Sequence, residues 1–115
     1  MNILEELTTV IKALGIPVET GVFSDKAPDC YIVILPLSDN FFFADNSPVT
    51  DIHEARLSIF SKKNYLPIKK KLESALIKAD ITITGRQYIG FEPDTGYHHY
   101  NIDTAKSYDY LLEED

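Results

Sequence analysis

The chain has 115 residues, of which 44% are hydrophobic and 25% are charged. These values are typical of one globular domain, 1–115, that can build a core without disulfides or metal ions. No apolar run approaches the roughly 20 residues of a membrane-spanning helix, and the chain does not begin with the basic and apolar regions of a signal peptide. We therefore expect synthesis in a cytoplasm and no membrane partner.

The net charge of −7 disfavours binding to the phosphates of nucleic acids, so we expect no direct nucleic-acid partner. The charge is unevenly distributed along the chain. Residues 62–78 contain six of the eleven lysines and arginines, whereas residues 19–54 contain seven acids and one lysine. Two interpretations remain open: solvated faces, or oppositely charged surfaces that attract a partner or another copy of the chain.

The first predicted element is a helix that begins after Asn2. Asn2 and Glu5 have the spacing of a capping box, and apolar residues recur at helical spacing as far as Leu14. The stretch 15–17, Gly-Ile-Pro, ends this helix. A short strand is expected over 18–23.

Strands dominate the middle of the predicted fold. Residues 30–35 are apolar on both faces of a strand, which indicates that both faces are covered. Residues 38–40 (Ser-Asp-Asn) predict a turn, 41–44 a short apolar segment, and 45–48 a loop. Residues 53–61 alternate between apolar and polar side chains, as in a half-buried strand.

The second half contains a helix and a hairpin. Asn64 is the expected helix cap, with Pro67 in the first turn. Two strands, 81–91 and 98–108, flank the turn-rich segment 92–97. The tail, 111–115, is acidic and is expected to fray. The apolar stripe of the helix comprises Ile68, Leu72, Ala75, Leu76 and Ala79.

The element order predicts an α+β domain with a mainly antiparallel sheet of five to six strands and two helices: helix, strands, helix, two-strand hairpin. Apolar residues on both faces of the sheet need cover. Either one helix lies on each face, or another subunit covers the second face.

Two adjacent histidines in the stretch 97–103 (Tyr-His-His-Tyr-Asn-Ile-Asp) raise the question of catalysis. Neighbours on a strand point to opposite faces, so His98 and His99 do not ligate one metal together, whereas His99 shares a face with Asp103. A zinc site needs three or four ligands, and none of the usual spacings occurs. We expect no catalytic residue, metal or cofactor here, and keep as an alternative a small metal-dependent enzyme that uses His98, His99 and Asp103.

Three consecutive phenylalanines, 41–43, must send at least one ring to the second face of the sheet. They are either part of the core or anchors of a protein interface. The sequence leaves both interpretations open.

Two longer stretches resemble a known family. They are "ADNSPVTDIHEARLSIFSKKNYLPIKKKLESAL" (44–76) and "ITGRQYIGFEPDTGYHHYNIDTAKSYDY" (83–110). The resemblance, over about residues 30–110, is to tail terminator (tail-to-head joining, tail completion) proteins of long-tailed phages and prophages of Gram-positive bacteria. Other minor tail and head-completion proteins look similar and form the alternative within the same biology.

This resemblance implies a structural, non-enzymatic role in the virion. Such proteins form a ring, usually a hexamer, that closes the head-proximal end of the tail tube and docks to the head connector. The expected partners are therefore copies of the chain, the tail tube protein and head-connector proteins. A ring needs two different patches on each subunit, and opposite charge on them would favour closure. The residues that we expect at these interfaces are Asp39, Phe42, Asp45, Asp51, Lys62, Lys63, Lys69 and Lys70.

Overall fold

The computed structural model describes residues 2–22 and 26–110. Its elements are α1 (Ile3–Ala13), β1 (Val18–Thr20), β2 (Cys30–Ala44), β3 (Ser47–Ser61), α2 (Leu66–Lys78), β4 (Thr82–Glu92) and β5 (Tyr97–Asp109). The described strands form one sheet in the order β1-β2-β3-β5-β4; β1 and β2 are parallel, and the other neighbours are antiparallel. The predicted α+β fold is confirmed. The tail 111–115 lies outside the described residues.

Helix α1 begins where the sequence predicts. The side chain of Asn2 accepts a hydrogen bond from the backbone N–H of Glu5 and donates one to the Glu5 carboxylate, each at 3.0 Å. The first of these bonds satisfies a backbone N–H that the first turn would otherwise leave unpaired. Gly15 follows the helix with a φ of 76°, a conformation that glycine adopts without strain. The residues that α1 buries are Ile3, Leu7 and Ile11.

The N-cap of helix α2 lies one residue after the predicted cap, Asn64. Its N-cap is Tyr65, whose side chain makes no capping hydrogen bond. Asn64 still contributes, because its Oδ1 accepts a hydrogen bond from the backbone N–H of Leu66 at 3.1 Å. Pro67 lies in the first turn, as predicted. The predicted stripe buries Leu72 and Leu76.

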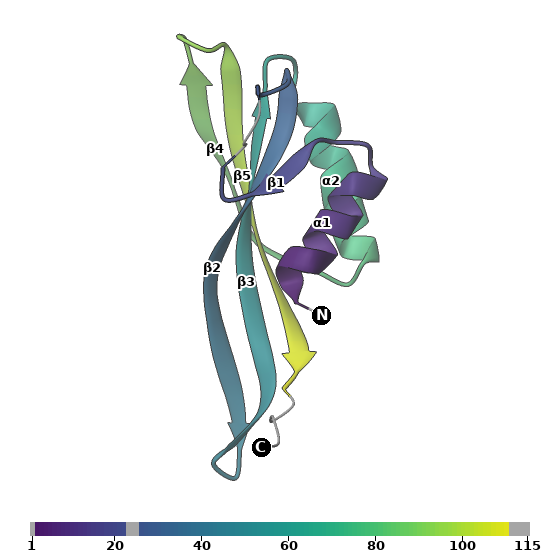
Figure 1. The fold of residues 1–115 in the computed structure, drawn as a ribbon, viewed down its shortest axis with the longest axis vertical. Helices are drawn as coiled ribbons and strands as arrows, with labels where there is room; N and C mark the ends of the chain where they lie inside the picture. The colour runs from purple at the N-terminus through teal and green to yellow at the C-terminus, as the bar shows by residue number, and fades with distance from the viewer. Residues whose placement is uncertain (1, 23–25, 111–115) are drawn as a thin grey trace.

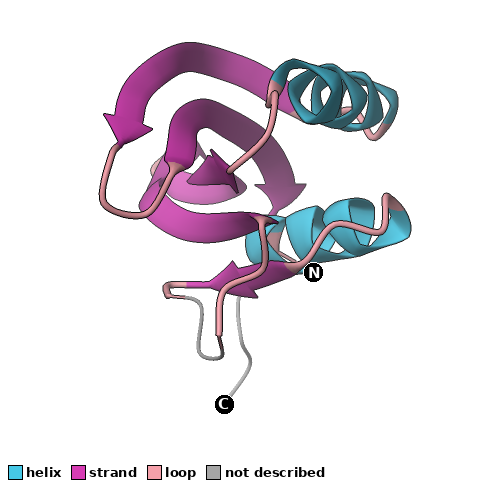
Figure 2. Cartoon of the chain, turned by 90° about the horizontal axis from the view of Figure 1, so that it is seen from above, coloured by secondary structure: helices cyan, strands magenta, loops and turns pink. Residues whose placement is uncertain are grey.

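Both helices lie on the same face of the sheet (Figures 1 and 2). Helix α1 packs on β1, β2 and β3, and α2 packs on β4 and α1. Alternate strand residues meet them in one core, which contains Ile32, Ile34, Ala55, Leu57, Ile59, Tyr100 and Ile102. The first alternative for covering the sheet, one helix on each face, is therefore wrong.

The hairpin of β2 and β3 is longer than the sequence predicts. Residues 38–40 are not a turn: Ser38, Asp39 and Asn40 pair with Glu54, His53 and Ile52. The chain reverses at Asp45 and Asn46, whose φ values of 50° and 62° are those of a two-residue type I′ turn. Consequently β3 begins at Ser47 and not at His53. A strand exposed on both faces tolerates the polar residues that are typical of turns.

A β-bulge interrupts β2 between Pro36 and Ser38, where Leu37 has no directly opposite partner in β3. One extra residue inverts the alternation of side chains, so odd-numbered residues after the bulge share a face with even-numbered residues before it. Simple alternation therefore assigns the phenylalanines to the wrong faces.

The C-terminal hairpin is close to the prediction. Strands β4 and β5 pair in antiparallel fashion on either side of residues 93–96. The strand predicted over 18–23 is shorter, because β1 is Val18–Thr20; Phe23 lies outside the described residues.

Candidate interaction surfaces

The far end of the β2–β3 ribbon projects away from the helices. We call residues 38–51 the hairpin extension; Figure 1 shows it reaching beyond the N-terminal end of α1. The molecule is correspondingly elongated, with extents of 52 × 26 × 24 Å. Phe41, Phe42 and Phe43 are 46%, 61% and 57% exposed, so the interpretation of these rings as core is wrong. Exposed aromatic rings that lie together on a monomer are typical of protein interfaces.

The three rings divide between the two faces of the extension. Phe41 and Phe43 lie edge to face, with ring centroids 5.7 Å apart, and Phe41 also meets the ring of Tyr110 at 4.9 Å. Phe42, between them in the strand, points to the opposite face. A partner can therefore contact aromatic surface on either side of this ribbon.

The hairpin extension is acidic. It contains Asp39, Asp45 and Asp51 and no lysine or arginine. Asp51 is engaged, because its Oδ2 lies 2.9 Å from Nε2 of His53, whose Nδ1 accepts a hydrogen bond from the backbone N–H of Ile3 at 3.3 Å. Asp39 and Asp45 form no ion pair within the described part of the chain. The three predicted acidic residues and Phe42 therefore all lie on the hairpin extension.

The predicted basic residues are not gathered in the same way. Lys62 and Lys63 belong to the loop before α2, where Nζ of Lys62 lies 4.0 Å from the Asp29 carboxylate and 5.0 Å from the centroid of the Tyr97 ring. Lys69 is turned inward: its side chain is 20% exposed and its Nζ lies 3.6 Å from the carboxylate of Glu73.

Three lysines without an ion pair to any described residue lie together on the outer face of α2. Lys70, Lys71 and Lys78 are exposed and form no ion pair with a described residue. They line a groove of about 740 Å³ between α2 and the C-terminal end of α1, with a floor that includes Ala13, Leu14 and Ala75. No sequence pattern predicts this groove, and of its three lysines only Lys70 is among the residues predicted at an interface.

The face of the sheet opposite the helices has aromatic side chains at one end. The Tyr31 and Phe60 rings stack with centroids 5.0 Å apart, and Phe60 stacks on His99 at 4.3 Å. Beside them, residues that include Val33 and Leu35 line a groove of about 360 Å³. Tyr97 secures the loop before β2 by donating a hydrogen bond from its hydroxyl to the carbonyl of Pro28 at 2.7 Å.

The candidate catalytic histidines take part in separate packing contacts. Nδ1 of His98 lies 3.0 Å from the Tyr88 hydroxyl on the helix-covered face, whereas His99 stacks on Phe60 on the other face. Asp103 shares the face of His99, as predicted, but forms a two-pronged ion pair with Arg56 at 2.8 and 3.1 Å. Across residues 2–22 and 26–110, no group of three or more His, Cys, Asp and Glu side chains is placed to hold a metal ion.

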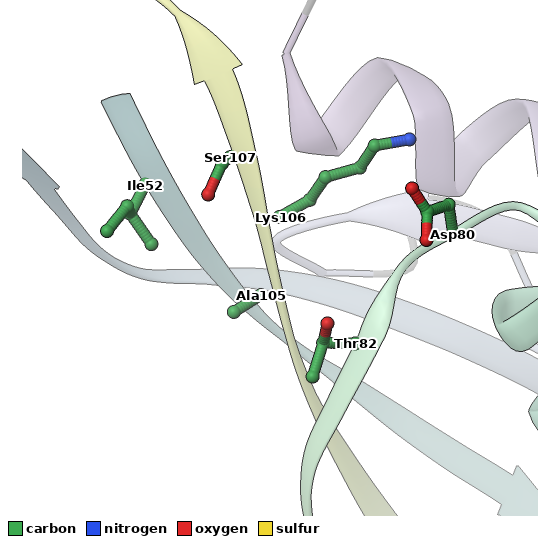
Figure 3. A pocket seen from close by; sticks show the side chains of 6 residues that line it. All are labelled: Ile52, Asp80, Thr82, Ala105, Lys106 and Ser107. Carbon is green, nitrogen blue, oxygen red and sulfur yellow. The ribbon is translucent and has the colours of Figure 1, made fainter. Parts of the chain in front are cut away.

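A smaller hollow lies where β4 enters the sheet beside β5. It measures about 310 Å³, and Figure 3 shows Lys106 extending from it toward α1. The ammonium of Lys106 lies 2.9 Å from the carboxylate of Glu6 and donates a hydrogen bond to the carbonyl of Ala79 at 3.1 Å. Because this cation is already neutralised by α1, the hollow offers little chemistry for an anionic ligand.

Comparison with known proteins gives no matching family model and no matching curated relative. Neither described helix is long and apolar enough to cross a membrane.

Proposed function

We propose that this protein is a structural component of a phage virion, a tail terminator that assembles as a ring and joins the tail tube to the head. The observation that carries the proposal is the hairpin extension, where Phe41, Phe42 and Phe43 remain exposed to solvent. Exposing such rings is unfavourable unless a partner covers them. Full burial of a phenylalanine contributes about 1.5–3 kcal/mol, and roughly half of each ring remains to be buried.

Two further features support an assembling protein. Neither described helix lies over the second sheet face, which has the apolar groove beside Tyr31 and Phe60. The acidic extension and the basic groove on α2 are separate patches, as a head-to-tail contact between subunits requires, and their opposite charge would favour that contact. The sequence resemblance supplies the phage context of the proposal, and another minor tail or head-completion protein is the alternative.

The metal-dependent enzyme has less support. Its three residues, His98, His99 and Asp103, are divided between two faces of the sheet. His98 and Asp103 have polar partners, whereas His99 stacks on Phe60 and its buried Nε2 has no hydrogen-bond partner among the described residues. We therefore retain the structural role as the proposed function.

The decisive experiment is deletion of the gene from the phage or prophage that carries it. If the protein closes the tail tube, electron microscopy of the deletion lysate should show tubes of irregular length and heads without tails, and expression of the wild-type chain should restore complete particles. Normal particles from the deletion strain would refute the proposal. Tailless heads beside tails of normal length would instead support the head-completion alternative.

A further inference from the structure

The hairpin extension and the groove between α1 and α2 match each other chemically. The extension offers exposed phenyl rings flanked by carboxylates, and the groove offers a mainly apolar lining, which includes Ala13, Leu14 and Ala75, flanked by ammonium groups. We propose that the hairpin extension of one copy of this chain docks in the α1–α2 groove of the next copy. This inference rests on the proposed function, because it names the contact by which the ring is built.

The floor of the groove suits an aromatic ring. Ala13, Ser74 and Ala75 have short side chains, so a ring can approach the backbones of the two helices closely. The volume of about 740 Å³ accommodates more than one phenyl ring. Ala13 and Pro67 are themselves exposed, so the site is accessible in the isolated chain.

The rim of the groove suits the charge of the extension. Lys70, Lys71 and Lys78 form no ion pair with a described residue, and the same holds for Asp39 and Asp45 on the extension. Docking would pair charges that the single chain leaves unpaired. The lysines would also lie near the faces of the phenylalanine rings, where a cation is attracted by the ring electrons.

The alternative groove on the opposite sheet face is less suitable for this occupant. Its lining includes Val22, Val33, Leu35 and Phe60 but no lysine or arginine, so it offers no charge to the aspartates of the extension. The two patches also lie on different parts of one subunit, and the contact is therefore head-to-tail. Such a contact can close into a ring or propagate, and it can also close as a two-fold dimer if two copies exchange their extensions.

A mixing experiment tests this contact on the full chain. Phe42→Ser impairs the extension and leaves the groove intact, whereas Lys71→Glu impairs the groove and leaves the extension intact. Each variant alone should associate at least about tenfold more weakly than wild type in analytical ultracentrifugation. An equimolar mixture should form a one-to-one heterodimer and nothing larger, because only one of the two possible contacts remains intact.

Two matched controls have the same chemical changes elsewhere. Phe91 is 51% exposed on β4 and Lys26 is exposed in the loop before β2, and both lie outside the extension and the groove. Phe91→Ser and Lys26→Glu should assemble like wild type. Circular dichroism of all four variants checks that each is folded.

A second measurement locates the contact directly. Equal amounts of ¹⁴N- and ¹⁵N-labelled chain are treated with a carbodiimide, which joins carboxylates to amines without a spacer. Peptides that combine the two labels should link Asp39 or Asp45 to Lys70, Lys71 or Lys78. Links from these aspartates to Lys26 or Lys62 would place the partner on another surface and overturn the inference.

The outcomes separate this contact from the proposed function. If wild type assembles and Phe42→Ser and Lys71→Glu assemble equally well, the contact is wrong and self-assembly stands. If wild type stays monomeric at high concentration and gives no mixed-label peptides, both the contact and unaided ring formation are wrong.

Discussion

Two halves of the same β2–β3 ribbon have opposite environments. In the half beneath the helices, Leu57 lies opposite Ile34 and both side chains are fully buried. In the hairpin extension, Phe42 lies opposite Thr50 and 61% of its surface is exposed. Backbone pairing extends through both halves despite register shifts between Pro36 and Ser38 and between Phe42 and Phe43, so strand formation alone does not determine which apolar residues contribute to the core. The helix layer does, because it reaches only the first half.

The largest effect on stability is expected when a buried side chain is shortened in the half covered by the helices. Leu57→Ala should reduce the free energy of unfolding by about 2–5 kcal/mol, because it removes a fully buried side chain and leaves a cavity. Urea denaturation followed by circular dichroism measures the loss. An unchanged denaturation midpoint would show that the covered half is not the stabilising core.

The helix layer itself can be weakened at the start of α1. Asn2→Ala removes the side chain that caps the backbone N–H of Glu5 and should cost about 1 kcal/mol in unfolding free energy. Asn2→Asp is the matched control, since it keeps an acceptor at the cap and should retain most of the stability. Equal losses in the two variants would argue against capping as the cause.

A smaller loss of unfolding free energy is expected from a change on the sheet face opposite the helices. Asp103→Asn converts the ion pair with Arg56 into a weaker contact and should cost about 0.5–1 kcal/mol, because the two side chains are 39% and 28% exposed and partly screened by water. Raising the salt concentration should narrow the difference from wild type. Asp94→Asn, in the exposed turn before β5, is the control and should change stability less.

The smallest effect on stability is expected in the hairpin extension. Phe42→Ser should change the unfolding free energy of the dilute monomer by no more than about 0.5 kcal/mol, because the native ring is mostly exposed. Thermal denaturation at low protein concentration measures it. A loss comparable to that of Leu57→Ala would mean that the ring is part of the core and not an interface anchor.

The same contrast explains what the sequence predicts well. In the body, α1, the alternating face of β3 and the C-terminal hairpin follow from helical and strand periodicity, because one side of each element is buried. In the extension both faces are exposed, periodicity carries no information, and residues 38–40 have the composition of a turn. The bulge at Leu37 also inverts which side chains point to the side of the sheet that carries the helices, and composition does not predict this inversion.

Of the two candidate interaction surfaces, the sequence predicts the candidate residues of the hairpin extension but not the α1–α2 groove. The aspartates and Phe42 are close in sequence, so their grouping on one element follows from the chain. The groove has Ala13 on one helix and Ala75 on the other, more than 60 residues apart in the numbering, and neither residue type signals binding. Only the packing of α1 against α2 brings them together.

The strand order has a consequence for how the chain folds. Strand β5 is inserted between β3 and β4, so neither of them has its inner neighbour until β5 has left the ribosome. Before that moment the nascent chain presents an unprotected edge on β3 next to three exposed phenylalanines, a combination that invites aggregation. Late insertion of the interior strand β5 therefore makes chaperone dependence during synthesis an expected property of this topology.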